Sequence, residues 1–234
     1  MIPFRKRPRI GRQRWENILF IHFPVEAKEI RPYVPDPLLI NEYDGSAWLS
    51  LVIFQAKHTG IIKTPNLFSY KDFPQLNLRT YVNFGREKGV FFLSLHADDP
   101  LVVRLGRLAG LPFLQGEMNL DNSKGSGGVW IHTRGGKSHS LSYELTSPSF
   151  NPDKGSLDYF LTEKYCIWML KGKRILKLPI SHLPWTLSRA RVNLLGDSFL
   201  PTKLKLGDPV TAHYSYQMTA FIHPYESFGI YKEE

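Results

Sequence analysis

The chain has 234 residues, of which 42% are hydrophobic and 22% are charged, so it can bury a large core and is not disordered as a whole. Its length is compatible with one domain, because closed or sandwiched β architectures often run this long. The net charge is +9, but six of the thirty basic residues fall in the first fourteen positions. Without them the charge is roughly +3, which gives no support to specific nucleic-acid binding.

The single cysteine and the absence of a signal or membrane-span pattern indicate the cellular compartment of the protein. Cys166 cannot form an internal disulfide, which favours a reducing compartment. The first residues lack the apolar stretch of a secretory signal, and no run of about 20 apolar residues predicts a membrane span. We therefore expect a cytoplasmic protein without membrane insertion, with a basic N-terminal arm at 1–13 and a single domain at 14–234.

Segments rich in aromatic and β-branched residues dominate the chain. They predict strands at 15–23, 47–55, 76–84, 90–97, 129–133 and 141–145, and a Gly-bounded hairpin turn at 83–89. Helices are expected at 26–34, at 101–109 with Pro100 in its first turn, and at 156–165 with Ser156 as N-cap. Parallel βαβ units are not required. The pattern predicts an α+β fold that is mainly antiparallel β, with a few helices.

The segment around 75–82 alternates polar and apolar residues. A strand would direct Gln75, Asn77, Arg79 and Tyr81 to one face and the apolar residues to the other. Two interpretations stay open, a cavity lining or a structural polar face. In a cavity, the fork-shaped guanidinium of Arg79 could bind a carboxylate through two hydrogen bonds.

The following strand alternates as well. Ser94, His96 and Asp98 would share one face of it, opposite Leu93 and Leu95. His96 is the best histidine candidate for a general acid or base, against the alternative of a structural histidine.

Established motifs are absent from the sequence. The other histidines do not have metal-ligand spacing, and no GxSxG, GxGxxG or P-loop pattern occurs. We therefore expect neither a metal nor a cofactor.

Several short segments carry a family resemblance when they are taken in order. They are WENILFIHFPV at 15–25, NLRTYV at 77–82, LTEKY at 161–165 and HLPW at 182–185. The pattern is similar to the YqjF-like family of uncharacterised bacterial proteins, within the acetoacetate-decarboxylase-like superfamily. The resemblance implies a cone-shaped β-barrel with a few outer helices, a deep central cavity and oligomers, so a homodimer is expected.

The same resemblance puts the decarboxylase chemistry in question. The decarboxylase forms a Schiff base through one of two adjacent lysines, and its pattern places the pair after Pro112, where this chain has Phe113 and Leu114. Gln75 also stands where the decarboxylase would have a glutamate. The remaining candidates for an imine are Lys57, Lys124 and Lys164, of which Lys164 is expected to pair with a carboxylate.

The leading functional hypothesis is a cavity that binds a small carbonyl-containing or carboxylate-containing molecule. Its expected lining is Gln75, Asn77, Arg79, Tyr81, Ser94 and His96 on the polar side, and Phe113, Leu114 and Met118 on the apolar side. One alternative is a lyase acting on a keto acid or polyketide-like molecule with a relocated nucleophile. Another is a non-enzymatic interaction protein whose barrel is filled and whose basic arm docks to an acidic partner.

Overall fold

A computed structural model describes residues 7–62, 70–123, 126–133, 138–195 and 209–230 of the chain. The strands in these ranges are β1 (Gly11–Val25), β2 (Leu39–Ile40), β3 (Ala47–Ile61), β4 (Phe73–Phe84), β5 (Glu87–Ala97), β6 (Phe113–Ser123), β7 (Ser126–Thr133), β8 (Ser138–Leu145), β9 (Cys166–Lys171), β10 (Arg174–Ser181), β11 (Ser188–Leu195), β12 (Thr211–Ile222) and β13 (Glu226–Ile230). The helices are α1 (Ala27–Ile30), continued by the 3-10 turn η2 (Arg31–Tyr33), α2 (Pro100–Leu108) and α3 (Leu157–Thr162). Over the same ranges, no helix combines the length and the apolar character needed to cross a membrane.

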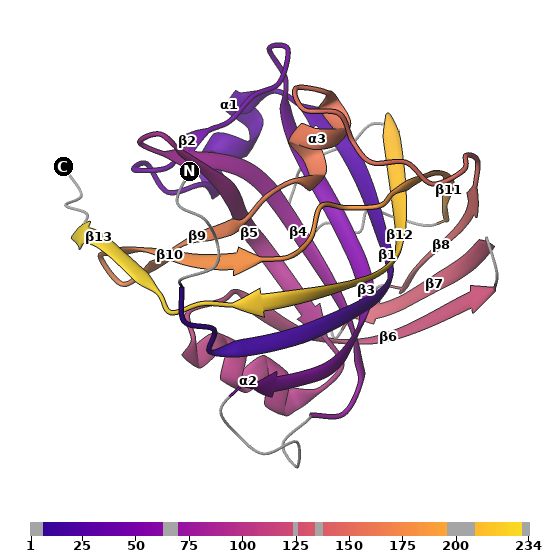
Figure 1. Ribbon diagram of the computed structural model, residues 1–234, viewed down its shortest axis with the longest axis horizontal. Helices are drawn as coiled ribbons and strands as arrows, with labels where there is room; N and C mark the ends of the chain where they lie inside the picture. The colour runs from indigo at the N-terminus through magenta and orange to yellow at the C-terminus, as the bar shows by residue number, and fades with distance from the viewer. Residues whose placement is uncertain (1–6, 63–69, 124–125, 134–137, 196–208, 231–234) are drawn as a thin grey trace.

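The strands form one hydrogen-bonded sheet that closes on itself twice. In the larger ring nine strands follow in the order β5-β6-β7-β8-β11-β12-β1-β3-β4, and pairing of β4 with β5 closes it. In the smaller ring, pairing of β10 with β12 closes the order β12-β10-β9-β5-β4-β3-β1. The shared strands β5, β4, β3, β1 and β12 therefore separate two interiors. Figure 1 shows α2 at one end of these strands and α1 and α3 at the other.

The predicted fold class is confirmed. Each of the six predicted strands corresponds to an observed one, and β4 and β5 form the predicted hairpin, with Gly85 at a φ of 59° in its turn. The predictions missed β2, β6 and the strands after α3. They also missed two parallel pairings, of β5 with β6 and of β5 with β9. The first of these joins its strands through α2, so the chain does contain a parallel crossover.

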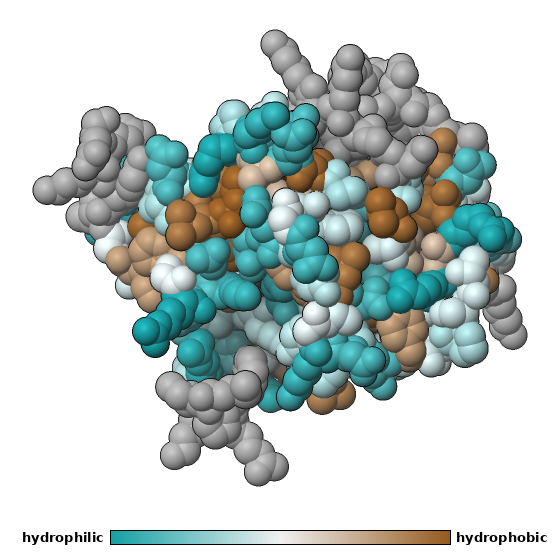
Figure 2. Space-filling view, turned by 90° about the horizontal axis from the view of Figure 1, so that it is seen from above, coloured by the Kyte–Doolittle hydropathy of each residue, from teal (hydrophilic) through white to brown (hydrophobic). Residues whose placement is uncertain are grey.

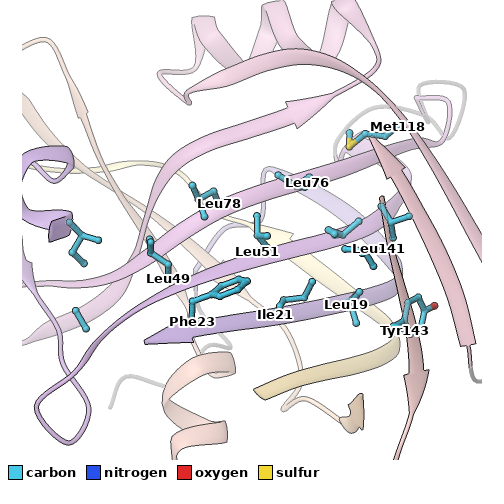
Figure 3. Close-up of a cluster of buried hydrophobic side chains, with 14 residues drawn as sticks. Leu19, Ile21, Phe23, Leu49, Leu51, Leu76, Leu78, Met118, Leu141 and Tyr143 are labelled. Carbon is cyan, nitrogen blue, oxygen red and sulfur yellow. The ribbon is translucent and has the colours of Figure 1, made fainter. Parts of the chain in front are cut away.

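The larger ring is filled by apolar side chains. Figure 3 shows these side chains meeting on one side of the sheet, with Leu19, Ile21 and Phe23 from β1, Leu49 and Leu51 from β3, Leu76 and Leu78 from β4, Met118 from β6, and Leu141 and Tyr143 from β8. Alternation along each strand leaves the intervening residues for the other interior. The stability of the ring therefore rests on one face of the shared strands, and the opposite face is available for a site.

The helices begin where the sequence predicts. The Asp99 carboxylate accepts hydrogen bonds from the backbone N–H groups of Leu101 and Val102, at 2.8 and 3.0 Å, and Pro100 occupies the first turn of α2. The Ser156 hydroxyl accepts from the N–H of Tyr159 at 3.2 Å and caps α3. The first helix is shorter than predicted, since α1 gives way to η2 at Arg31 before Pro35.

The expected basic arm contacts the domain from residue 7 onward. Arg7 pairs with Glu226 at 2.6 Å, and the Arg9 guanidinium lies 3.9 Å from the centroid of the Phe221 ring. Strand β1 already begins at Gly11, within the expected arm. Figure 2 views the end of the molecule opposite α2, where hydrophilic and apolar residues are interspersed.

Candidate pocket in the smaller ring

A pocket of about 680 Å³ occupies the interior of the smaller ring. Its walls come from the faces of β1, β3, β4 and β5 that point away from the apolar core, and from β9, β10 and α2. Four apolar lining residues at the α2 end are exposed: Ile10 (41%), Leu101 (46%), Leu105 (56%) and Ile61 (65%). The pocket therefore opens to solvent beside α2.

Strand β4 supplies the polar row of the pocket. Gln75, Asn77 and Arg79 all line it, as the alternation along the strand predicts. The Oδ1 atom of Asn77 and the Nε atom of Arg79 are buried and have no hydrogen-bond partner among the described residues. A buried polar atom without a partner is costly, so a group that binds both atoms would be favoured there.

Arg79 is fixed from one side only. Its Nη2 donates to the carbonyl oxygen of Leu161 in α3 at 3.0 Å, and its guanidinium lies 5.6 Å from the centroid of the Phe20 ring. Within the described part of the chain, Arg79 forms no ion pair with a carboxylate. Its Nε atom, which has no partner among the described residues, is therefore available to a ligand.

Lys164 lies beside Arg79 in the same pocket. Its Nζ donates to the carbonyl oxygen of Phe160 and lies 5.3 Å from the centroid of the Tyr81 ring, which the Arg79 guanidinium also approaches to 5.8 Å. Burial, followed by the repulsion of Arg79, lowers the pKa of Lys164 to about 7. The expected carboxylate partner is not found among the described residues, and the amine is largely unprotonated slightly above neutral pH.

Ser94 and His96 do not join this row, although the sequence predicted that they would. Arg79 pairs with Phe92 and Leu78 pairs with Ser94, so Leu93 is an extra residue that forms a β-bulge. The bulge reverses the alternation of β5. Phe92 and Leu95 line the pocket, while Ser94 and His96 share a face with the apolar core.

The other predicted lining residues divide between several environments. Phe113 lines the pocket, whereas Leu114 is 39% exposed outside it and Met118 packs in the apolar core. Tyr81 is fully buried behind Arg79, and its hydroxyl donates to the Leu161 carbonyl oxygen at 2.7 Å. Of the alternative lysines, Lys57 pairs with Glu16 at 3.0 Å away from the pocket, and Lys124 lies outside the described residues.

A chain of buried hydrogen bonds leads from Tyr81 across the shared strands to Asp158 in α3. The Tyr81 hydroxyl contacts Ser50 Oγ at 2.6 Å, and Ser50 Oγ contacts His22 Nδ1 at 2.6 Å. His22 Nε2 contacts His213 Nδ1 at 3.2 Å, and His213 Nε2 contacts the Asp158 carboxylate at 2.9 Å. The chain joins α3, β12, β1, β3 and β4, and it ends on the carbonyl that also holds Arg79.

A count of hydrogens shows that the neutral groups alone cannot complete this chain. The five contacts from Asp158 to the Leu161 carbonyl need five hydrogens, while a neutral tyrosine, a serine and two neutral histidines carry four. Burial and the charge of His213 both lower the pKa of His22, so His22 stays neutral.

Sequence reasoning missed the residues that close the pocket. Trp15 and Trp185 stack with centroids 6.1 Å apart, and both line it together with α2. Only the WENILF and HLPW segments pointed to them, and nothing local indicates that they meet. Among the described residues, no cluster of three or more His, Cys, Asp or Glu residues could hold a metal ion.

Comparisons with known proteins agree with this architecture. Residues 12–219 match the DUF2071 family, described as uncharacterized conserved proteins. The chain is 32% identical over 223 residues to the uncharacterized protein YqjF of Bacillus subtilis (strain 168), which covers 92% of this chain and 91% of YqjF.

Solved structures of similar fold share little sequence with the chain. The enduracididine biosynthesis enzyme MppR with HEPES buffer bound gives a TM-score of 0.72 at 11% identity, covering 97% of this chain and 90% of that one. A second MppR structure is complexed with pyruvate, at a TM-score of 0.68 and 12% identity, covering 97% and 93%. An acetoacetate decarboxylase gives 0.68 at 16% identity, covering 99% and 96%. The chain therefore belongs to the DUF2071 family and has the acetoacetate-decarboxylase-like fold.

Proposed function

We propose that the chain binds a small molecule with a carboxylate or carbonyl group in the pocket of the smaller ring, with Arg79 binding the oxygen atoms of that group. The proposal rests on the position of two basic residues, Arg79 and Lys164, close together at the inner end of the pocket. Neither of them has a carboxylate partner among the described residues. Both side chains are only partly exposed, so water screens the charge of Arg79 weakly and an anion at this position would be stabilised.

The volume of the pocket supports binding over the interaction-protein alternative. About 680 Å³ lies well above the roughly 300 Å³ of the smallest ligand sites. The apolar filling that the alternative requires is present in the larger ring, on the other face of the shared strands. The pyruvate complex of MppR provides a precedent for a small keto acid in a protein of this fold.

Isothermal titration calorimetry with a panel of carboxylic and keto acids would test the assignment of Arg79. Arg79→Gln should weaken binding at least about tenfold, and Arg79→Lys should recover only part of the loss, because an ammonium cannot make the two parallel hydrogen bonds of a guanidinium. The matched control is Arg86→Gln, at an exposed residue in the β4–β5 turn. Unchanged affinity in a folded Arg79→Gln protein would remove Arg79 from the site.

Lys164 favours a second candidate function, that of a lyase acting on a keto acid. An unprotonated amine can attack a carbonyl carbon and, with loss of water, form an imine. Borohydride should then reduce the imine to a stable adduct of known mass on Lys164, and Lys164→Met should abolish it. A complete absence of adduct across the panel would leave non-covalent binding as the function of the pocket.

The homodimer and the cytoplasmic location stay predictions, which size-exclusion chromatography and cell fractionation would test.

A further inference from the structure

The polarity of the pocket changes along its length. Arg79 and Lys164 lie at the end next to the residues of α3, whereas the end beside α2 is mostly apolar, and its polar lining residues Gln13 and Thr59 bond to each other at 2.9 Å. Between the two ends the walls are mostly aromatic, with Phe20, Phe54, Phe73, Phe113, Trp15 and Trp185 among them. A ligand complementary to such a site has one polar end and an apolar body.

The volume is too large for a small keto acid alone. At about 30 Å³ per water molecule, 680 Å³ corresponds to roughly 20 waters. An acid of a few carbon atoms at Arg79 would leave most of that water against aromatic walls, where its release by an apolar group is favourable. Sites of this size typically hold drug-sized ligands.

The mouth of the pocket is mostly apolar as well. Leu101 and Leu105 of α2 are about half exposed, and Ile10 just before β1 and Ile61 at the end of β3 flank them; Arg12, which also lines the pocket, is exposed nearby. This rim continues the apolar wall to the solvent-exposed surface, where polar side chains would have a lower free-energy cost of exposure. Gly106 brings α2 directly onto Phe113, since a Cβ atom at this position would lie 2.2 Å from the Phe113 ring. The helix thus forms part of the apolar wall as well as its outer edge.

We infer that the ligand is an amphiphile, an acid or carbonyl compound whose polar group binds at Arg79 and whose apolar body extends along the aromatic walls to α2. This inference rests on the proposed function and names the chemical class of its ligand. A straight alkyl chain and a fused aromatic body both satisfy the geometry, and the two belong to separate arms of the test.

The experiment is a calorimetric titration with straight-chain acids from butanoate to decanoate, with naphthoic acids, and with the alcohols that match each chain length. Full burial of a methylene is worth about 0.8 kcal/mol, which corresponds to an affinity gain of up to about fourfold per methylene. Decanoate has six more methylenes than butanoate, and with about half of this free-energy gain realised we expect it to bind on the order of 100-fold more tightly. Acids should bind more tightly than the matching alcohols in the wild type, and this preference should disappear in Arg79→Gln.

Two variants on one helix locate the apolar body. Leu105→Glu places a charge at the mouth and should weaken decanoate at least about tenfold while leaving butanoate unchanged. Leu108→Glu is the matched control, because Leu108 is 65% exposed on the same helix and does not line the pocket. Equal loss in both variants would contradict the placement.

The outcomes separate this inference from the proposed function. Equal, Arg79-dependent affinity for pyruvate, butanoate and decanoate would overturn the amphiphile and retain the proposed function. Acids and alcohols that bind equally, with no effect of Arg79→Gln, would overturn the role of Arg79. No binding of any acid would overturn both.

Discussion

Replacement of Lys164 by methionine should make the protein more stable at neutral pH, because it removes a lysine that the pocket forces toward the neutral form. Burial and Arg79 lower the pKa of Lys164 from 10.5 to about 7. The unfolded chain therefore binds more protons than the folded one between these two values, and the wild-type stability rises with pH through that window. At about 1.36 kcal/mol per pH unit, this single group adds about 3 kcal/mol to the free energy of unfolding between pH 7 and pH 9.5.

Urea unfolding followed by tryptophan fluorescence at pH 7.0 and pH 9.5 measures this contribution. Other lysines titrate too, so the informative quantity is the difference between the wild type and Lys164→Met at each pH. The variant should be the more stable protein at pH 7.0, and its advantage should shrink by about 3 kcal/mol at pH 9.5. Lys154→Met, at an exposed residue before α3, should leave the wild-type pH dependence unchanged. A constant difference between Lys164→Met and the wild type would show that Lys164 titrates as an ordinary lysine and would refute the reasoning.

Three further predictions concern other buried groups. Burial lowers the pKa of His96 from 6.5 to about 4, so its contribution to stability is present above pH 6.5 and is lost as the pH falls. In urea unfolding, His96→Leu should therefore lose about 2 kcal/mol less unfolding free energy than the wild type between pH 8 and pH 5. An equal loss in the two proteins would contradict this. Nitrogen NMR of the imidazole rings should find His22 neutral well below pH 6.5, because burial and the nearby His213 and Arg79 lower its pKa, and an ordinary titration of His22 near pH 6.5 would contradict this. Gly106→Ala should lower the melting temperature by several degrees, because its Cβ would overlap the Phe113 ring, and an unchanged melting temperature would show that α2 can move aside.

The sequence allowed the fold class and the polar row of β4 to be predicted, because both depend on local patterns. Period-two alternation is sufficient to place Gln75, Asn77 and Arg79 on one face of a strand. The bulge at Leu93 leaves no such pattern, since β5 alternates smoothly in sequence on both sides of it. The predictions for Ser94 and His96 therefore continued the alternation across the bulge and assigned both residues to the pocket face.

The rest of the site depends on contacts between distant segments. Lys164 reaches Arg79 because α3 packs across the end of β4, and Trp185 reaches Trp15 across the smaller ring. The spacing of residues within one segment does not predict which distant segment it will contact. The resemblance marked these segments as parts of a shared pattern, but their meeting in one pocket follows only from the closure of the second ring.

The double closure of the sheet has a consequence for how this family can diversify. Along β4, even-numbered residues such as Leu76 and Leu78 hold the larger ring together, while odd-numbered residues such as Asn77 and Arg79 face the pocket. Selection for stability acts on the first set and selection for ligand binding acts on the second, although the two sets alternate in one strand. Relatives that bind other ligands should keep the first set apolar and vary the second, so a chimera that exchanges only odd-numbered residues of β4 should fold normally and change its ligand.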